Sequence, residues 1–95
     1  MNKRDAYAQK LKAQLDQWKA EIDRMNAGAD RLEADARIEF RKQMERLQAR
    51  REEASRRLED LGKAAEGSWE DLREGMDRAW GELDRAIREA ASRFR

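Results

Sequence analysis

In the stretch YAQKLKAQLDQWKAEIDRM (residues 7–25), an apolar or aromatic side chain returns every three or four positions. The same spacing continues almost to the last residue, with one polar interruption at Arg51. Side chains spaced in this way lie on one face of an α-helix, and a helix with one apolar face packs against other helices. The pattern predicts an all-α, elongated protein in which long helices form a helical hairpin or coiled coil, without strands.

The composition agrees with this fold class and excludes several functions. The 95 residues include no proline, and isoleucine is the only β-branched type, so strands have little to form from. Charged residues make up 45% of the chain, but 22 Lys+Arg against 21 Asp+Glu leave a net charge of only +1. Because the two signs alternate, no basic patch forms, and nucleic-acid association is the least favoured function.

The location of the protein follows from what the sequence lacks. Cysteine is absent, which agrees with a reducing compartment. No run approaches the ~20 apolar residues that span a bilayer, and the charged start does not look like a secretory signal. We therefore expect a cytoplasmic protein.

Glycine and small polar residues indicate where the helices end. Gly67 is followed by Ser68, with Asp71 three residues later, which predicts the end of one helix and the capped start of the next. Residues 1–66 are thus predicted to form a long amphipathic helix, and residues 67–95 a C-terminal helix that folds back. A weaker break is indicated near Gly28, but the apolar stripe passes through it in phase, which favours a continuous helix over residues 3–65.

A turn at Gly67 sets a register for the hairpin. Positions whose numbers sum to about 134 then face each other, which brings Leu61 opposite Leu72 and Ala54 opposite Trp80. The residues expected to pack in the hairpin are Phe40, Met44, Leu47, Leu58, Leu61, Leu72, Met76, Trp80, Leu83, Ile87 and Phe94.

Residues 7–36 keep an apolar stripe without a partner in this arrangement. A second, antiparallel copy centred on Ile22 covers the stripe well, so an antiparallel homodimer is expected, and a higher helical bundle is an alternative. The expected self-association interface is Leu11, Leu15, Trp18, Ile22, Met25 and Leu32. A monomeric three-helix arrangement with a turn at Gly28 is also compatible with the stripe.

The sequence offers no chemistry-bearing constellation. Its three serines have no histidine to activate them, its carboxylates lie beside arginines on exposed helix faces, and its glycines are isolated. We therefore expect no enzymatic activity, no catalytic residue, no metal and no cofactor. The tryptophans all lie on the stripe, where packing in a core is the favoured role.

The C-terminal segment contains an internal repeat. WEDLREGMDRA (residues 69–79) and WGELDRAIREA (residues 80–90) both follow the pattern Trp-x-x-Leu with an apolar residue four positions later. Amphipathic helices with an eleven-residue period also occur in proteins that bind lipid surfaces. Peripheral binding to a membrane surface is therefore the alternative function, although the balanced charge weakens attraction to anionic lipid.

Three motifs resemble a family of small bacterial coiled-coil proteins, sometimes labelled stress-response proteins. They are KRDxYxxKLKxQLDxWxAEID (residues 3–23), ADARIEF (residues 34–40) and SWEDL (residues 68–72). The resemblance covers most of the chain and implies a cytoplasmic, non-enzymatic, stress-linked role. The residues and the resemblance together favour a self-associating structural or interaction protein.

Overall fold

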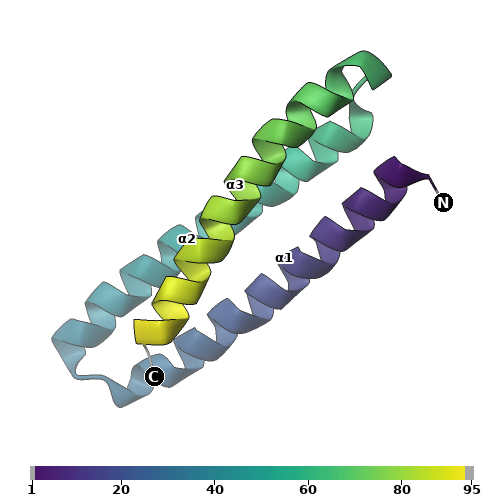
Figure 1. The fold of residues 1–95 in the computed structure, drawn as a ribbon. Helices are drawn as coiled ribbons and strands as arrows, with labels where there is room; N and C mark the ends of the chain where they lie inside the picture. The colour runs from purple at the N-terminus through teal and green to yellow at the C-terminus, as the bar shows by residue number, and fades with distance from the viewer. Residues whose placement is uncertain (1, 94–95) are drawn as a thin grey trace.

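The computed structural model describes residues 2–93, in which three helices lie side by side (Figure 1). Helix α1 spans Lys3–Gly28, a 3-10 turn η1 spans Ala29–Arg31, α2 spans Ala34–Lys63 and α3 spans Glu66–Arg93. Helices α1 and α3 run in the same direction and α2 runs in the opposite one. Within residues 2–93 there is no strand, so the all-α prediction is confirmed.

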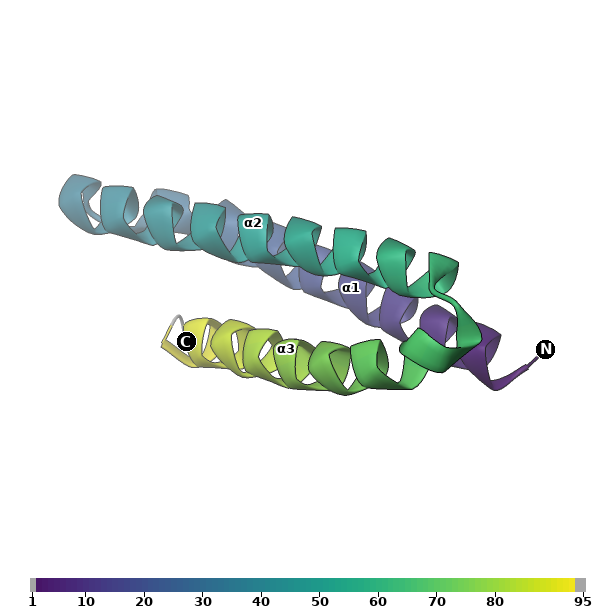
Figure 2. The same cartoon turned by 90° about the horizontal axis from the view of Figure 1, so that it is seen from above.

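The molecule is elongated, as predicted. Its extents are 51 × 20 × 17 Å, and its radius of gyration is 15.5 Å, against about 12 Å for a compact domain of this length. The view turned by 90° shows α3 lying to one side of the pair formed by α1 and α2 (Figure 2). The amino terminus lies at the same end as the turn between α2 and α3.

The first turn corrects the prediction of one continuous helix over residues 3–65. Gly28 and Ala29 keep right-handed helical backbone angles, and only Leu32 (φ −87°, ψ 154°) and Glu33 (φ −63°, ψ 158°) are extended. The Arg37 N–H then donates to the Glu33 carbonyl at 2.8 Å, which starts α2. Folding back covers the stripe of α1 within one chain, and a stripe in phase cannot distinguish one long helix from two joined by a short turn.

The second turn lies earlier than predicted. Gly67 and Ser68 are inside α3, and no glycine in residues 2–93 has a positive φ. The chain turns instead at Ala64 (φ −70°, ψ 145°), and the Ala65 carbonyl accepts the first hydrogen bonds of α3 at 3.0 and 3.1 Å. Alanine adopts the extended angles of this turn without strain, so the turn does not require a glycine. Gly67 therefore does not end a helix here.

The core is one continuous cluster along the axis of the bundle. Every buried residue in residues 2–93 is apolar, and Ile22 and Met44 are the most enclosed large side chains at 1% exposure each. The buried residues are Leu11, Leu15, Trp18, Ile22, Met25, Ala29, Phe40, Met44, Leu47, Ala54, Leu58, Leu61, Trp69, Met76, Trp80, Leu83, Ile87 and Ala90.

Candidate interaction surface

Helix α1 contacts α3 through two aromatic pairs. The Tyr7 and Trp69 rings meet edge to face, with centroids 5.6 Å apart and an interplanar angle of 75°. The Trp18 and Trp80 rings are tilted by 40°, with centroids 5.1 Å apart. The edge-to-face arrangement of the first pair is a preferred geometry, and both centroid distances lie within the range of about 4.5–7 Å found for aromatic pairs. We call the contact line formed by these four residues the aromatic seam.

The spacing of the seam explains the internal repeat in α3. Trp69 and Trp80 are eleven residues apart, and so are Tyr7 and Trp18. Eleven residues make about three helical turns, so each pair of rings returns to the same face of its helix. Because α1 and α3 are parallel, the two spacings match and set the register of one helix on the other.

Each aromatic side chain of α1 also carries a polar atom that reaches α3. Trp18 Nε1 donates to Asp84 at 3.3 Å, and Asp84 pairs with Arg88 at 2.9 Å. The Tyr7 hydroxyl donates to Asp77, which accepts from Arg73 at 2.8 Å. Rings that are buried on one side and hydrogen-bonded on the other fix both the depth and the direction of the contact.

The environment of Tyr7 and Arg73 changes their acid–base behaviour. Partial burial, followed by the hydrogen bond to Asp77 and its negative charge, raises the pKa of Tyr7 well above the ordinary value. The hydrogen bond and charge of Glu70 raise the pKa of Arg73. Both shifts favour the protonation states that make these contacts, the neutral phenol and the charged guanidinium.

Arg4 fastens the start of α1 to the turn between α2 and α3. Its guanidinium donates to the carbonyls of Leu61 and Ala64, at 3.3 and 2.9 Å. Both carbonyls lie at the end of α2, where the Leu61 carbonyl also accepts from the Ala64 N–H at 3.2 Å, and a cation there is favoured by the helix dipole. The same guanidinium lies 5.4 Å from the centre of the Trp69 ring, within range of a cation–π contact.

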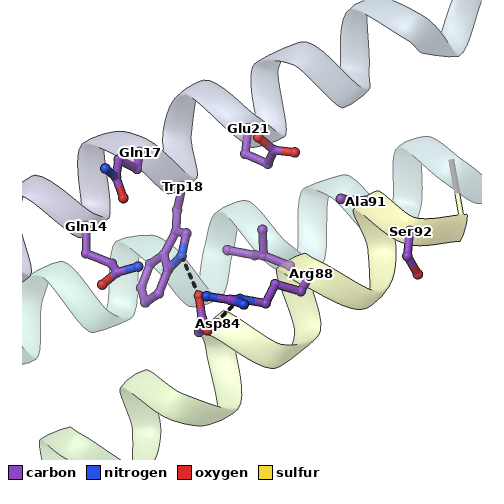
Figure 3. Close-up of a pocket in the computed structure, with 9 residues that line it drawn as sticks. Gln14, Gln17, Trp18, Glu21, Asp84, Arg88, Ala91 and Ser92 are labelled. Carbon is purple, nitrogen blue, oxygen red and sulfur yellow. Dashed lines mark hydrogen bonds and ion pairs between the residues drawn. The ribbon is translucent and has the colours of Figure 1, made fainter. Parts of the chain in front are cut away.

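A groove follows the seam toward the end of α3 (Figure 3). It has a volume of about 400 Å³ and is open to solvent. In Figure 3 the Trp18 ring points from α1 toward Asp84 on α3. The remaining lining residues are Gln14, Gln17, Glu21, Ile87, Arg88, Ala91 and Ser92. The carboxylate of Asp84 already accepts from Trp18 and pairs with Arg88. We therefore interpret the groove as the solvent-exposed side of the contact between α1 and α3.

The residues predicted for self-association lie inside the single chain. Leu11, Leu15, Trp18, Ile22 and Met25 are 1–5% exposed, and Leu32 packs partly buried against the same cluster. Because α2 and α3 of the same chain cover them, the unpartnered stripe that motivated a dimer centred on Ile22 does not exist in this structure.

Most residues predicted for the hairpin are buried. Phe40, Met44, Leu47, Leu58, Leu61, Met76, Trp80, Leu83 and Ile87 lie in the core, and Phe94 lies outside the described residues. Leu72 is the exception, because it is 49% exposed. The pairing of Leu61 with Leu72 is wrong, since the turn comes earlier and Trp69 shares a pocket with Leu61 instead.

Sequence reasoning missed Arg4, Asp77 and Asp84 as positioning residues and missed the parallel contact of α1 with α3. A signal existed, because Tyr7 and Trp18 have the same spacing as Trp69 and Trp80. No helix within residues 2–93 has the length and apolar character required to cross a bilayer. The same part of the chain holds no group of three metal-ligating side chains.

Comparison of the chain with protein-family models, with characterised proteins and with solved structures found no match. The class that the structure itself defines is an elongated three-helix bundle with a parallel aromatic seam between its first and third helices.

Proposed function

We propose that the chain is a non-enzymatic structural protein that acts by packing its helices against other helices, first against a second copy of itself. The observation that carries this proposal is the composition of the buried face of α1. Leu11, Leu15, Trp18, Ile22 and Met25 form an apolar surface on a helix joined to the rest of the chain by a short turn. A second copy carries an identical hairpin that can receive this surface.

The two side chains whose pKa values are shifted make structural contacts, which supports a structural role. The pKa values of both Tyr7 and Arg73 are raised by contacts within the bundle. Tyr7 links α1 to α3 through Asp77, and Arg73 forms ion pairs along the surface of α3. Catalytic groups with shifted pKa values usually face a cleft where a substrate can reach them. The stress-linked, cytoplasmic role is a further part of the proposal and rests on the resemblance of residues 3–23, 34–40 and 68–72.

Sedimentation equilibrium over a series of protein concentrations tests self-association. We expect the mean mass to rise from the monomer value of 11.2 kDa toward twice that value as concentration increases. A mass that stays at 11.2 kDa up to about millimolar protein, the effective concentration that a short linker provides within one chain, would contradict the proposal.

A peripheral lipid-surface protein is the second candidate, favoured by the 49% exposure of Leu72 on α3. Leu72 lies one turn from Trp69, which is 8% exposed, so a larger lipid-binding face requires α3 to leave the bundle. Co-sedimentation with neutral and with anionic vesicles separates the two functions. Binding that is lost in Leu72→Gln supports the lipid role, and no binding to either vesicle removes it.

A further inference from the structure

We propose that two copies of this chain exchange their first helices. In the exchanged dimer, residues 3–63 of each copy form one continuous helix, and α1 packs on the α2–α3 hairpin of the other copy. This inference rests on the proposed self-association and specifies its geometry.

The turn between α1 and α2 has the properties of a hinge. Only Leu32 and Glu33 have extended backbone angles, while Gly28 and Ala29 are already helical. A change of ψ at these two residues therefore joins α1, η1 and α2 into one helix. The chain has no proline, and no residue of the hinge has a positive φ, so neither feature fixes the closed form.

The apolar stripe fits both forms. In a continuous helix Met25, Ala29, Leu32, Ala36 and Phe40 recur every three or four positions and stay on one face. In the closed form the stripe loses one member at the turn, since Ala36 is exposed while Met25, Ala29 and Phe40 are buried. The sequence around the hinge is thus compatible with a helix that the closed chain does not form.

The ion pair that spans the hinge is weak. Arg41 and Asp30 form an ion pair at 3.1 Å, but their side chains are 47% and 78% exposed. Exposed ion pairs contribute little to stability. In a continuous helix these residues stand about 16 Å apart along the axis, so opening breaks the pair within the chain at a small cost.

The contacts of α1 with the hairpin are the same whether the hairpin belongs to its own chain or to the other copy. Ile22 and Met44 line one pocket between α1 and α2, and Arg4 donates to the Ala64 carbonyl. Residues of α1 and α2 are therefore side by side where their numbers sum to about 66–68. Two exchanged copies keep this register, which places residues 33 and 34 beside the twofold axis. This differs from a dimer centred on Ile22.

The balance between the forms depends on concentration. A short flexible linker gives α1 an effective concentration of about millimolar near its own hairpin. The closed monomer therefore dominates in dilute solution, and refolding from denaturant at about millimolar protein favours exchange, because each α1 then meets foreign hairpins as often as its own.

Glu33→Pro is the variant that separates the two forms. Its φ of −63° is the angle that a proline ring fixes, and Leu32 before it has the extended angles that a residue preceding proline requires. The same proline lies in the middle of the continuous helix, where it is strongly unfavourable. Two hinges per dimer, each losing a factor of about 10², lower the association constant about 10⁴-fold.

Glu33→Ala is the matched control. It removes the same carboxylate but keeps the backbone N–H and favours helix. Glu33 makes no side-chain capping bond to α2 in this structure, so the alanine does not remove a cap. We expect Glu33→Ala to form at least as much dimer as the wild type.

A distance within one chain identifies exchange directly. Lys10 and Arg56 are exposed and lie level on neighbouring antiparallel helices, and the chain has no native cysteine, so both positions accept spin labels through cysteine. In the closed chain the labels lie within about 30 Å, given helix axes about 10 Å apart. In the continuous helix they stand about 69 Å apart.

The experiment refolds doubly labelled chain in an excess of unlabelled chain at about millimolar concentration, isolates the dimer and measures the distance by pulsed electron resonance. A dimer with the long distance, abolished by Glu33→Pro and kept in Glu33→Ala, supports exchange. A dimer that keeps the short distance and tolerates Glu33→Pro contradicts exchange but leaves self-association intact. A monomer under all conditions contradicts both proposals.

Discussion

Replacing Leu61 or Leu72 by alanine distinguishes the hairpin register predicted from the sequence from the register in the structure. The sequence pattern places them opposite each other in the hairpin, whereas the structure buries Leu61 to 2% exposure and leaves Leu72 49% exposed. Truncating Leu61 to alanine removes about three carbon groups from the core, a transfer cost of about 2.4 kcal/mol. The cavity left behind brings the expected loss to about 2–5 kcal/mol.

Leu72→Ala is expected to cost less than about 1 kcal/mol. Half of the side chain already contacts water, solvent fills the space it leaves, and alanine is the better helix former. A chain of 95 residues has a free energy of unfolding of about 5–14 kcal/mol, so only the largest expected loss for Leu61→Ala reaches the lower end of this range. Urea unfolding followed by circular dichroism measures both losses. Equal losses for the two variants would refute the observed register.

Three further predictions concern single positions. The pKa of Tyr7 is raised by burial and by Asp77, so the neutral phenol stabilises the fold below the unfolded pKa of about 10, and this contribution is lost as pH rises through the higher folded value. Absorbance titration of this single tyrosine is expected to show ionisation well above pH 10 in the folded protein, and a folded midpoint near 10 would contradict the contact with Asp77. Gly81→Ala is expected to raise the free energy of unfolding by about 0.5–1 kcal/mol, because a Cβ there meets no atom within 4 Å and alanine favours helix, and a lower urea midpoint would show a clash instead. Arg51→Leu is expected to stabilise the bundle by about 1 kcal/mol, since Arg51 Nε is buried with no hydrogen-bond partner among the described residues, and a loss of stability in thermal unfolding would show that its charge is needed.

The sequence predicted the helices well because their spacing pattern follows from local geometry. Leu11, Met44 and Ile87 lie on the buried face that a period of 3.6 residues assigns them. The positions of the turns were harder to predict. Ala64 turns the chain with ordinary extended angles, while Gly67, a residue typical of turns, is in a helix.

The topology could be predicted only by comparing the spacing of aromatic residues in two distant segments, which the pattern within one segment does not reveal. A stripe in phase across Leu32 and Glu33 is equally compatible with one long helix and with two helices and a turn. The equal spacing of the aromatic residues in α1 and α3 contained the missing information. It indicates two parallel helices in register, which requires α2 to run back between them.

The central claim is that the aromatic seam sets how α1 packs on α3. The chain has one tyrosine and three tryptophans, so their ring protons are few enough to assign by nuclear magnetic resonance. The structure predicts nuclear Overhauser contacts between Tyr7 and Trp69 and between Trp18 and Trp80, in the closed monomer and in an exchanged dimer alike. Contacts of Tyr7 with Trp80, or the absence of both predicted pairs in the folded protein, would contradict the account.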